Sequence, residues 1–252
     1  MARQTLTLGR LFDIRVGVHV SWLAVYAFMS IALARGLTTL PRGEAYAFGA
    51  VCALVLFASV VAHELAHALV ARRFGVRTSA ITLFLFGGVA TLEEEPSSPK
   101  ADALVALAGP ALSAALAVLA FALLFAVDRF VPGRFGTALG YLGAYVALAN
   151  AVLAVFNVIP AYPMDGGRGL RAFLWHRWRD RVAATNAASR VGIVFALLLV
   201  AAGVFLVAGS RELVYGWYVV LGAFLLRQGM SQERASRSHA SPRDAKEIAA
   251  TA

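Results

Sequence analysis

The sequence predicts an all-α polytopic membrane protein with six transmembrane helices and a short re-entrant β-hairpin after the second helix. Three observations support this fold class. Of the 252 residues, 60% are hydrophobic and only 15% are charged, which lies outside the range of soluble domains. Several apolar runs are long enough to cross a bilayer. One short segment rich in β-branched and aromatic residues is interrupted by Gly87-Gly88 and is too short to span.

The six apolar runs are bounded by charged or turn-forming residues and lie at about 16–34, 45–73, 101–127, 137–159, 191–208 and 213–226. They divide the chain into three parts. Residues 1–15 form a short, polar and basic N-terminal segment, residues 16–227 form the six-span membrane domain, and residues 228–252 form a polar tail that we expect to be disordered.

The basic residues indicate an orientation for these spans. With six spans, 18 of the 23 lysines and arginines fall on the side that holds both termini, and 5 fall on the other side. The positive-inside rule therefore predicts that both termini are cytoplasmic. The net charge of +9 is explained by this alternation with the spans, so we expect no nucleic-acid partner. The alanine- and arginine-rich composition favours a prokaryotic plasma membrane.

A candidate metal site lies in the second half of the second span, in the sequence His63-Glu64-Leu65-Ala66-His67. On a helix, His63 and His67 are i and i+4, so both imidazoles leave the same face one turn apart and can reach one metal ion. Glu64 is rotated by about 100° from His63, which places a carboxylate beside the ion. This pattern is typical of a zinc hydrolase, in which the glutamate acts as the general base. The alternative is two histidines and a glutamate buried for packing or ion pairing.

The segment from about residue 78 to residue 92 alternates in the manner of a strand pair around Gly87-Gly88. An open strand edge is tolerated at membrane depth only where protein or a water-filled cavity meets it. Such an edge could pair with an extended peptide, so Gly87 and Gly88 are candidate substrate-binding residues. The alternative is a plain loop at the membrane interface.

Asp165 is the candidate third zinc ligand, because a catalytic zinc usually has three protein ligands and a water. It follows a stretch in which Pro160 and Pro163 break the fourth helix, and Gly166 and Gly167 come directly after it. A broken helix of this kind can present a carboxylate at membrane depth. The alternatives are a helix N-cap or an ion pair with Arg168.

Two asparagines lie in the fourth span, close to this broken segment. Asn150 and Asn157 carry amide donors suited to hold a substrate backbone or a developing oxyanion. Interhelical hydrogen bonding is the alternative role for both.

Taken together, these motifs resemble the site-2 protease family of intramembrane zinc metalloproteases. The resemblance covers roughly residues 10–228, and its matching segments are 63–67, 86–90, 108–110 and 157–168. It implies a six-helix core in which His63, His67 and Asp165 bind one Zn²⁺ ion and Glu64 is the general acid/base. It also implies that Asn157 contacts substrate.

The resemblance further implies hydrolysis of a peptide bond within or beside the transmembrane segment of a membrane-anchored protein, often a regulatory protein already trimmed by another protease. We expect a compact form, because we find neither a PDZ-like insertion nor a nucleotide-binding domain pair. Two other functions stay open at this point: a metal-ion transporter that uses the same ligands, and an inactive scaffold that binds membrane proteins.

Overall fold

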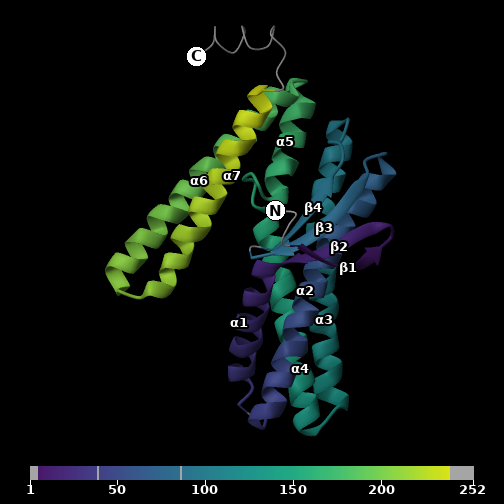
Figure 1. Ribbon diagram of the computed structural model, residues 1–252, viewed down its shortest axis with the longest axis vertical. Coiled ribbons are helices and arrows are strands. Elements are labelled where there is room, and N and C mark those ends of the chain that lie inside the picture. Colours follow the sequence, from purple (N-terminus) through teal and green to yellow (C-terminus); the bar gives the residue numbers. More distant parts are fainter. Residues whose placement is uncertain (1–4, 39, 86, 239–252) are drawn as a thin grey trace. The chain divides into compact units, whose positions relative to one another are not determined.

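The computed structural model describes residues 5–38, 40–85 and 87–238 (Figure 1). The described chain folds into helices and one sheet in the order β1 (Thr5–Leu11), β2 (Ile14–His19), α1 (Val20–Gly36), α2 (Arg42–Arg73), β3 (Thr78–Phe84), β4 (Gly87–Leu92), α3 (Pro99–Phe130), α4 (Gly133–Val158), α5 (Asp165–Trp178), α6 (Arg181–Ser210), the 3-10 turn η2 (Leu213–Tyr215) and α7 (Gly216–Ser238).

Five of these helices are long and apolar enough to cross a membrane: Arg42–Arg73, Pro99–Val127, Gly133–Val158, Arg181–Ser210 and Leu213–Ser236. The apolar α1 is shorter, at 17 residues. The fold is therefore a mostly helical membrane fold with a small sheet. The chain forms two compact units, unit 1 (Met1–Pro96 and Ala108–Val155) and unit 2 (Ser97–Leu107 and Phe156–Ala252).

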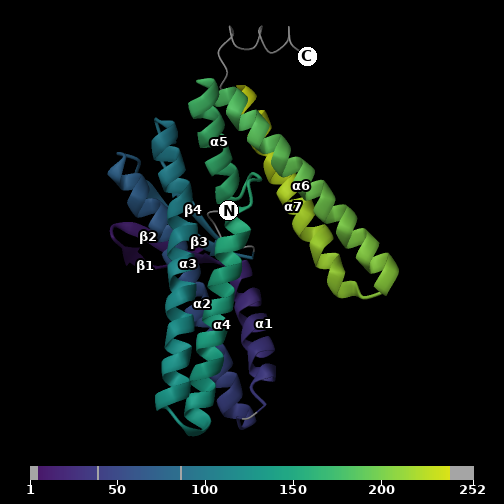
Figure 2. The same ribbon diagram turned by 180° about the vertical axis from the view of Figure 1, so that it is seen from behind.

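Unit 1 contains a four-stranded sheet in the order β1-β2-β3-β4, which Figure 2 shows beside α2. β3 and β4 pair antiparallel, β2 and β3 pair parallel, and β1 and β2 pair antiparallel. The sheet therefore has more strands than the two-stranded hairpin that the sequence predicts. Within the N-terminal segment that we described only as polar and basic, residues 5–15 form β1, the turn after it and the start of β2.

The alternation of buried and exposed side chains along β2 explains why this strand joins the sheet. Ile14, Val16 and Val18 are all buried, as expected for a strand with one face on the core. The strand continues to His19, whose Nδ1 accepts a hydrogen bond from the Ser21 amide 3.2 Å away and caps α1. The first apolar helix therefore begins at Val20 and not at residue 16.

The sheet fixes the orientation of α2 through apolar contacts on both sides of the candidate site. Ile81 of β3 is fully buried and packs with Ala68, the residue that follows His67. Leu83 of the same strand packs with Phe57 and Trp22. Two aliphatic side chains of β3 thus pack against α2 before and after the candidate site.

Unit 2 consists of the first turns of α3, the end of α4 and the helices α5, α6 and α7. α6 and α7 run side by side (Figures 1 and 2). Arg190 of α6 lies 3.6 Å from Glu233 of α7, and Ser236 donates a hydrogen bond of 2.5 Å to Asn186. α7 continues to Ser238, so residues 228–238, which we expected to be part of a disordered tail, are helical. Residues 239–252 lie outside the described residues.

Candidate metal centre

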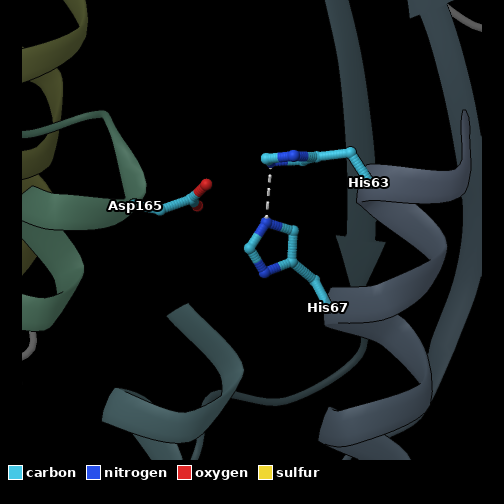
Figure 3. Close-up of side chains that lie close together, drawn as sticks. All are labelled: His63, His67 and Asp165. Atoms are coloured by element: carbon cyan, nitrogen blue, oxygen red, sulfur yellow. Dashed lines mark hydrogen bonds between the residues drawn. The ribbon is translucent and has the colours of Figure 1, made fainter. Parts of the chain in front are cut away.

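The two histidines of α2 face each other in the interior of unit 1. His63 is 2% exposed and His67 is 4% exposed, and their Nε2 atoms are 3.2 Å apart (Figure 3). Their i, i+4 spacing on a continuous helix produces this geometry. The predicted pair of ligands is therefore brought together by α2 alone.

The distance between these nitrogens fits one zinc ion. Two nitrogen ligands at 2.0–2.1 Å from a tetrahedral zinc ion lie about 3.3 Å from each other. The Nδ1 atom of His63 is 2.9 Å from Ser113 Oγ of α3. When Nδ1 carries the proton and donates it to Ser113, Nε2 keeps its lone pair for the metal. The donor set and its hydrogen bonding therefore fit zinc.

A close approach of α3 to the histidines keeps this space free of side chains. A Cβ atom at Gly109 would lie 2.2 Å from His67 Nε2 and 2.5 Å from His63 Nε2. Any residue other than glycine would therefore overlap both nitrogens. Glycine at position 109 therefore leaves both Nε2 atoms accessible.

Glu64 lies next to β4. A Cβ atom at Gly88 would lie 2.7 Å from Glu64 Cγ, so the strand passes directly beside the carboxylate side chain. β4 is an edge of the sheet, and Gly88 pairs with Leu83 of β3 on its other side. The predicted strand edge and the predicted general base are thus neighbours within unit 1. Gly87, with φ of +127°, begins the strand in a conformation that favours glycine.

In unit 2, Asp165 is the first residue of α5 and is partly buried (Figure 3). Met164 is the N-cap residue, so the N-cap alternative for Asp165 is wrong. Its position is set by the backbone of the broken segment before it. A Cβ at Gly166 would lie 2.2 Å from the Val158 carbonyl oxygen, and one at Gly167 would lie 2.4 Å from the Tyr162 nitrogen. The two glycines therefore let α5 begin in direct contact with this segment.

The two asparagines differ in their surroundings. Asn150 is 1% exposed, and its amide donates to Ser59 Oγ at 3.1 Å and to the Val146 carbonyl at 2.9 Å. It links α4 to α2 one turn before His63, which is the interhelical role that we considered as its alternative. Asn157 lies at the end of α4 in unit 2 and is partly buried.

Sequence reasoning missed three buried polar residues. Ser113 follows Gly109 by one helical turn and contacts His63. Asp102 of α3 is fully buried and receives two hydrogen bonds from Arg171 of α5, at 2.9 and 2.7 Å. A single carboxylate near the start of an apolar helix was the available signal for this pair. Arg168, considered as a partner of Asp165, lies 3.6 Å from Asp102.

Comparison with known proteins supports the family resemblance. The family model described as Peptidase family M50 matches residues 51–140 and 135–199. Rip3 of Mycobacterium tuberculosis (strain H37Rv) is 39% identical over 237 residues, which are 92% of this chain and 59% of Rip3. The protein sll0528 of Synechocystis is 36% identical over 232 residues, 91% of this chain and 60% of that protein. The names of both describe zinc metalloproteases.

A solved structure shows the same fold. The structure titled "Site-2 Protease from Methanocaldococcus jannaschii" has a TM-score of 0.59 and 28% sequence identity, and the alignment covers 91% of this chain and 95% of that one. The chain spans about 60% of the length of the curated relatives sll0528 and Rip3. From the family match over more than half of its length, we conclude that this chain belongs to peptidase family M50.

Proposed function

We propose that this chain is an intramembrane zinc metalloprotease that hydrolyses a peptide bond within or beside the transmembrane segment of a membrane-anchored protein. The observation that carries this proposal is the pair of buried imidazole nitrogens 3.2 Å apart on a helix of membrane length, with Glu64 beside them. Ionisable side chains at membrane depth are costly and usually functional. The membership of family M50 assigns the reaction class.

In this proposal His63, His67 and Asp165 hold one zinc ion, each with one ligand atom. Two imidazoles and a carboxylate form a donor set of the kind found at catalytic zinc. Zinc, when bound in such a site, acidifies a water and polarises the carbonyl of the peptide bond. Glu64 accepts the proton from the attacking water and then delivers it to the leaving amine.

Glu64 is suited to this proton transfer by its position. It lies one residue after His63 on α2, and Gly88 of β4 leaves no side chain between the strand and its carboxylate. A peptide that pairs with the free edge of β4 would run alongside Glu64 with its backbone extended. This places no demand on the substrate side chains, because the contacts are made by backbone hydrogen bonds. A helical substrate must unwind before it can bind in this way.

The proposed membrane arrangement has six spans, with α1 added to the five long helices. α1 has 17 residues, the lower limit for a spanning helix, and its β2 connection provides a polar boundary at His19. Six spans and the distribution of 18 against 5 basic residues support cytoplasmic termini in a prokaryotic plasma membrane. The β3–β4 hairpin is then re-entrant, and Asn157 would contact the substrate backbone. Suitable substrates include membrane-anchored regulatory proteins already cut by another protease.

The proposal is tested by product analysis on a panel of single-span membrane peptides in detergent, with mass spectrometry of the products and zinc determination on each enzyme sample. The matched variant is Glu64→Gln, which removes the base and keeps the shape. We expect cleavage inside a span by the wild type, a loss of about 100-fold or more in the variant, and equal zinc in both. Equal cleavage by both proteins would refute the assigned role of Glu64. Zinc flux into proteoliposomes without cleavage would instead support the transporter.

A further inference from the structure

A basic hollow of about 500 Å³ lies at the end of α2, where the β1–β2 hairpin meets the start of β3. Its lining includes four arginines, Arg10, Arg15, Arg72 and Arg77. All of them belong to unit 1, and the volume lies in the range of small-ligand sites in proteins. The hollow has no part in the proposed metal centre.

The charges that line this hollow do not balance. Asp13 and Glu93 are its acidic residues, so four positive charges stand against two negative ones. Arg10 and Arg15 are moreover direct cross-strand partners in the β1–β2 pair. Like charges directly opposite each other on two strands are destabilising. An anion between the two guanidinium groups would remove this repulsion.

The hollow also offers hydrogen-bond donors of the kind that phosphate prefers. Guanidinium groups bind phosphate oxygens in a bidentate fork. Thr78, which lines the hollow, has a buried hydroxyl oxygen with no hydrogen-bond partner in the described part of the chain. Buried polar groups are normally hydrogen-bonded, so a bound acceptor would also give the Thr78 hydroxyl a partner.

The location of the hollow favours a phosphate that belongs to a lipid. Arg72 is in the last turn of α2, a helix long enough to cross the membrane, and its guanidinium donates a hydrogen bond to the carbonyl oxygen of Phe12 in the β1–β2 turn. Leu8 is 66% exposed and Phe12 is 61% exposed on the same hairpin. Arginines at a helix end with exposed apolar side chains beside them match the boundary between lipid phosphates and acyl chains.

We propose that the hollow bounded by Arg10, Arg15, Arg72 and Arg77 binds a phosphate group, and that its source is the headgroup of an anionic membrane lipid. The lipid fixes the β1–β2 hairpin on the membrane surface at the end of α2. This site is independent of the proposed hydrolysis.

The test measures lipid binding to the purified full chain in detergent by native mass spectrometry and by the shift in thermal unfolding temperature. The probes are dioleoyl-phosphatidylglycerol, dioleoyl-phosphatidylcholine and inorganic phosphate. The test variant is Arg10→Gln with Arg15→Gln. The control variant is Arg129→Gln with Arg177→Gln, which removes two exposed arginines outside the hollow.

For the wild type and the control variant, we expect one tightly held phosphatidylglycerol and a rise in unfolding temperature that phosphatidylcholine does not produce. In the test variant, phosphatidylglycerol binding should weaken about ten-fold or more. Its unfolding temperature without lipid should be equal to or above that of the wild type, because a repulsive pair has been removed.

Two outcomes distinguish the source of the phosphate. If inorganic phosphate binds and phosphatidylglycerol does not, with loss in the test variant only, the phosphate site stands and the lipid assignment is wrong. Equal binding of phosphatidylglycerol and of inorganic phosphate by the wild type and the test variant would overturn the site. A fall in unfolding temperature of the lipid-free test variant would show that the arginines serve the fold, and would also count against it.

Discussion

In unit 2 the carboxylate of Asp102 is fully buried and receives two hydrogen bonds from Arg171, whereas in unit 1 the buried His63 and His67 present nitrogen atoms to each other. In the first cluster the guanidinium of Arg171 donates to the carboxylate of Asp102, and the two opposite charges neutralise each other. The second joins two groups of the same kind, and an N–H···N hydrogen bond between them leaves only one of the two Nε2 atoms as an acceptor. In the proposed site, a cation between the two nitrogens would use the lone pairs of both.

The electrostatics of Arg171 illustrate the complete cluster. Burial alone lowers the pKa of Arg171, but the hydrogen bond and the charge of Asp102 outweigh it and raise the pKa above its ordinary value. A raised pKa stabilises the fold at every pH below the unfolded value, and this contribution is lost only as the pH rises through the folded one. The arginine therefore stays charged throughout the neutral range, and no metal is needed there.

Gly109→Ala should have the largest effect, because it fills the space beside both histidine nitrogens. The methyl group would lie 2.2 Å from His67 Nε2, so we expect zinc affinity to fall about 100-fold or more and proteolysis to be lost with it. Zinc content of the purified protein measures the effect.

The matched control is Gly140→Ala in α4, where the added Cβ would lie 3.7 Å from the nearest atom, Leu124 Cδ1. Both changes favour a helix by about 0.5–1 kcal/mol, so a general effect of alanine would appear in both. Full zinc occupancy in Gly109→Ala would contradict the geometry of the site.

Asp102→Asn breaks this cluster, because it removes the negative charge that lies against the buried guanidinium of Arg171. Loss of one partner from a buried ion pair costs about 3–5 kcal/mol of folding free energy. The combined change Asp102→Leu with Arg171→Met should recover most of this loss, because it removes both charges together. Reversible unfolding in mixed micelles compares the three proteins. If the combined variant is no more stable than Asp102→Asn, the two charges of Asp102 and Arg171 do not stabilise each other as an isolated pair.

Ser113→Ala removes the partner of His63 Nδ1 and should weaken zinc binding by about 10–100-fold. The ring then loses the hydrogen bond that fixes its tautomer and orientation. Competition with a chelator measures the affinity. Ser30→Ala is a suitable control, since Ser30 is a buried serine whose hydroxyl, among the described residues, donates within its own helix to the Tyr26 carbonyl at 2.7 Å. Identical zinc affinities for the two variants would assign no role to Ser113.

Gly88→Ala is expected to have the smallest effect on the metal, because it acts on Glu64 and not on the ligands. The added Cβ would lie 2.7 Å from Glu64 Cγ, so the carboxylate must move. Cleavage should fall about ten-fold or more while zinc content stays unchanged. Gly9→Ala in β1, which would meet no atom within 4 Å, is the control. Unchanged cleavage in Gly88→Ala would argue against the strand edge beside Glu64.

The parts of the site that sequence predicted are those set by one local element. His63, Glu64 and His67 share one helix, so their spacing alone places them, and Gly87-Gly88 and Asp165-Gly166-Gly167 marked breaks that the chain does contain. The parts it missed depend on contacts between distant segments. Ser113 reaches His63 across 50 positions, Asp102 reaches Arg171 across 69, and β2 pairs with β3. None of these partners is visible in a periodicity.

Zinc K-edge X-ray absorption on the purified wild type and on Asp165→Ala tests the assignment of the three zinc ligands, since it counts ligands by type. For the wild type, we expect one zinc per chain with two imidazole nitrogens and oxygen ligands at about 2.0–2.2 Å, and no sulfur. Asp165→Ala should keep both imidazoles and lose one oxygen ligand or the ion itself. A zinc shell with fewer than two imidazoles, or one unchanged in Asp165→Ala, would contradict the assignment of His63, His67 and Asp165.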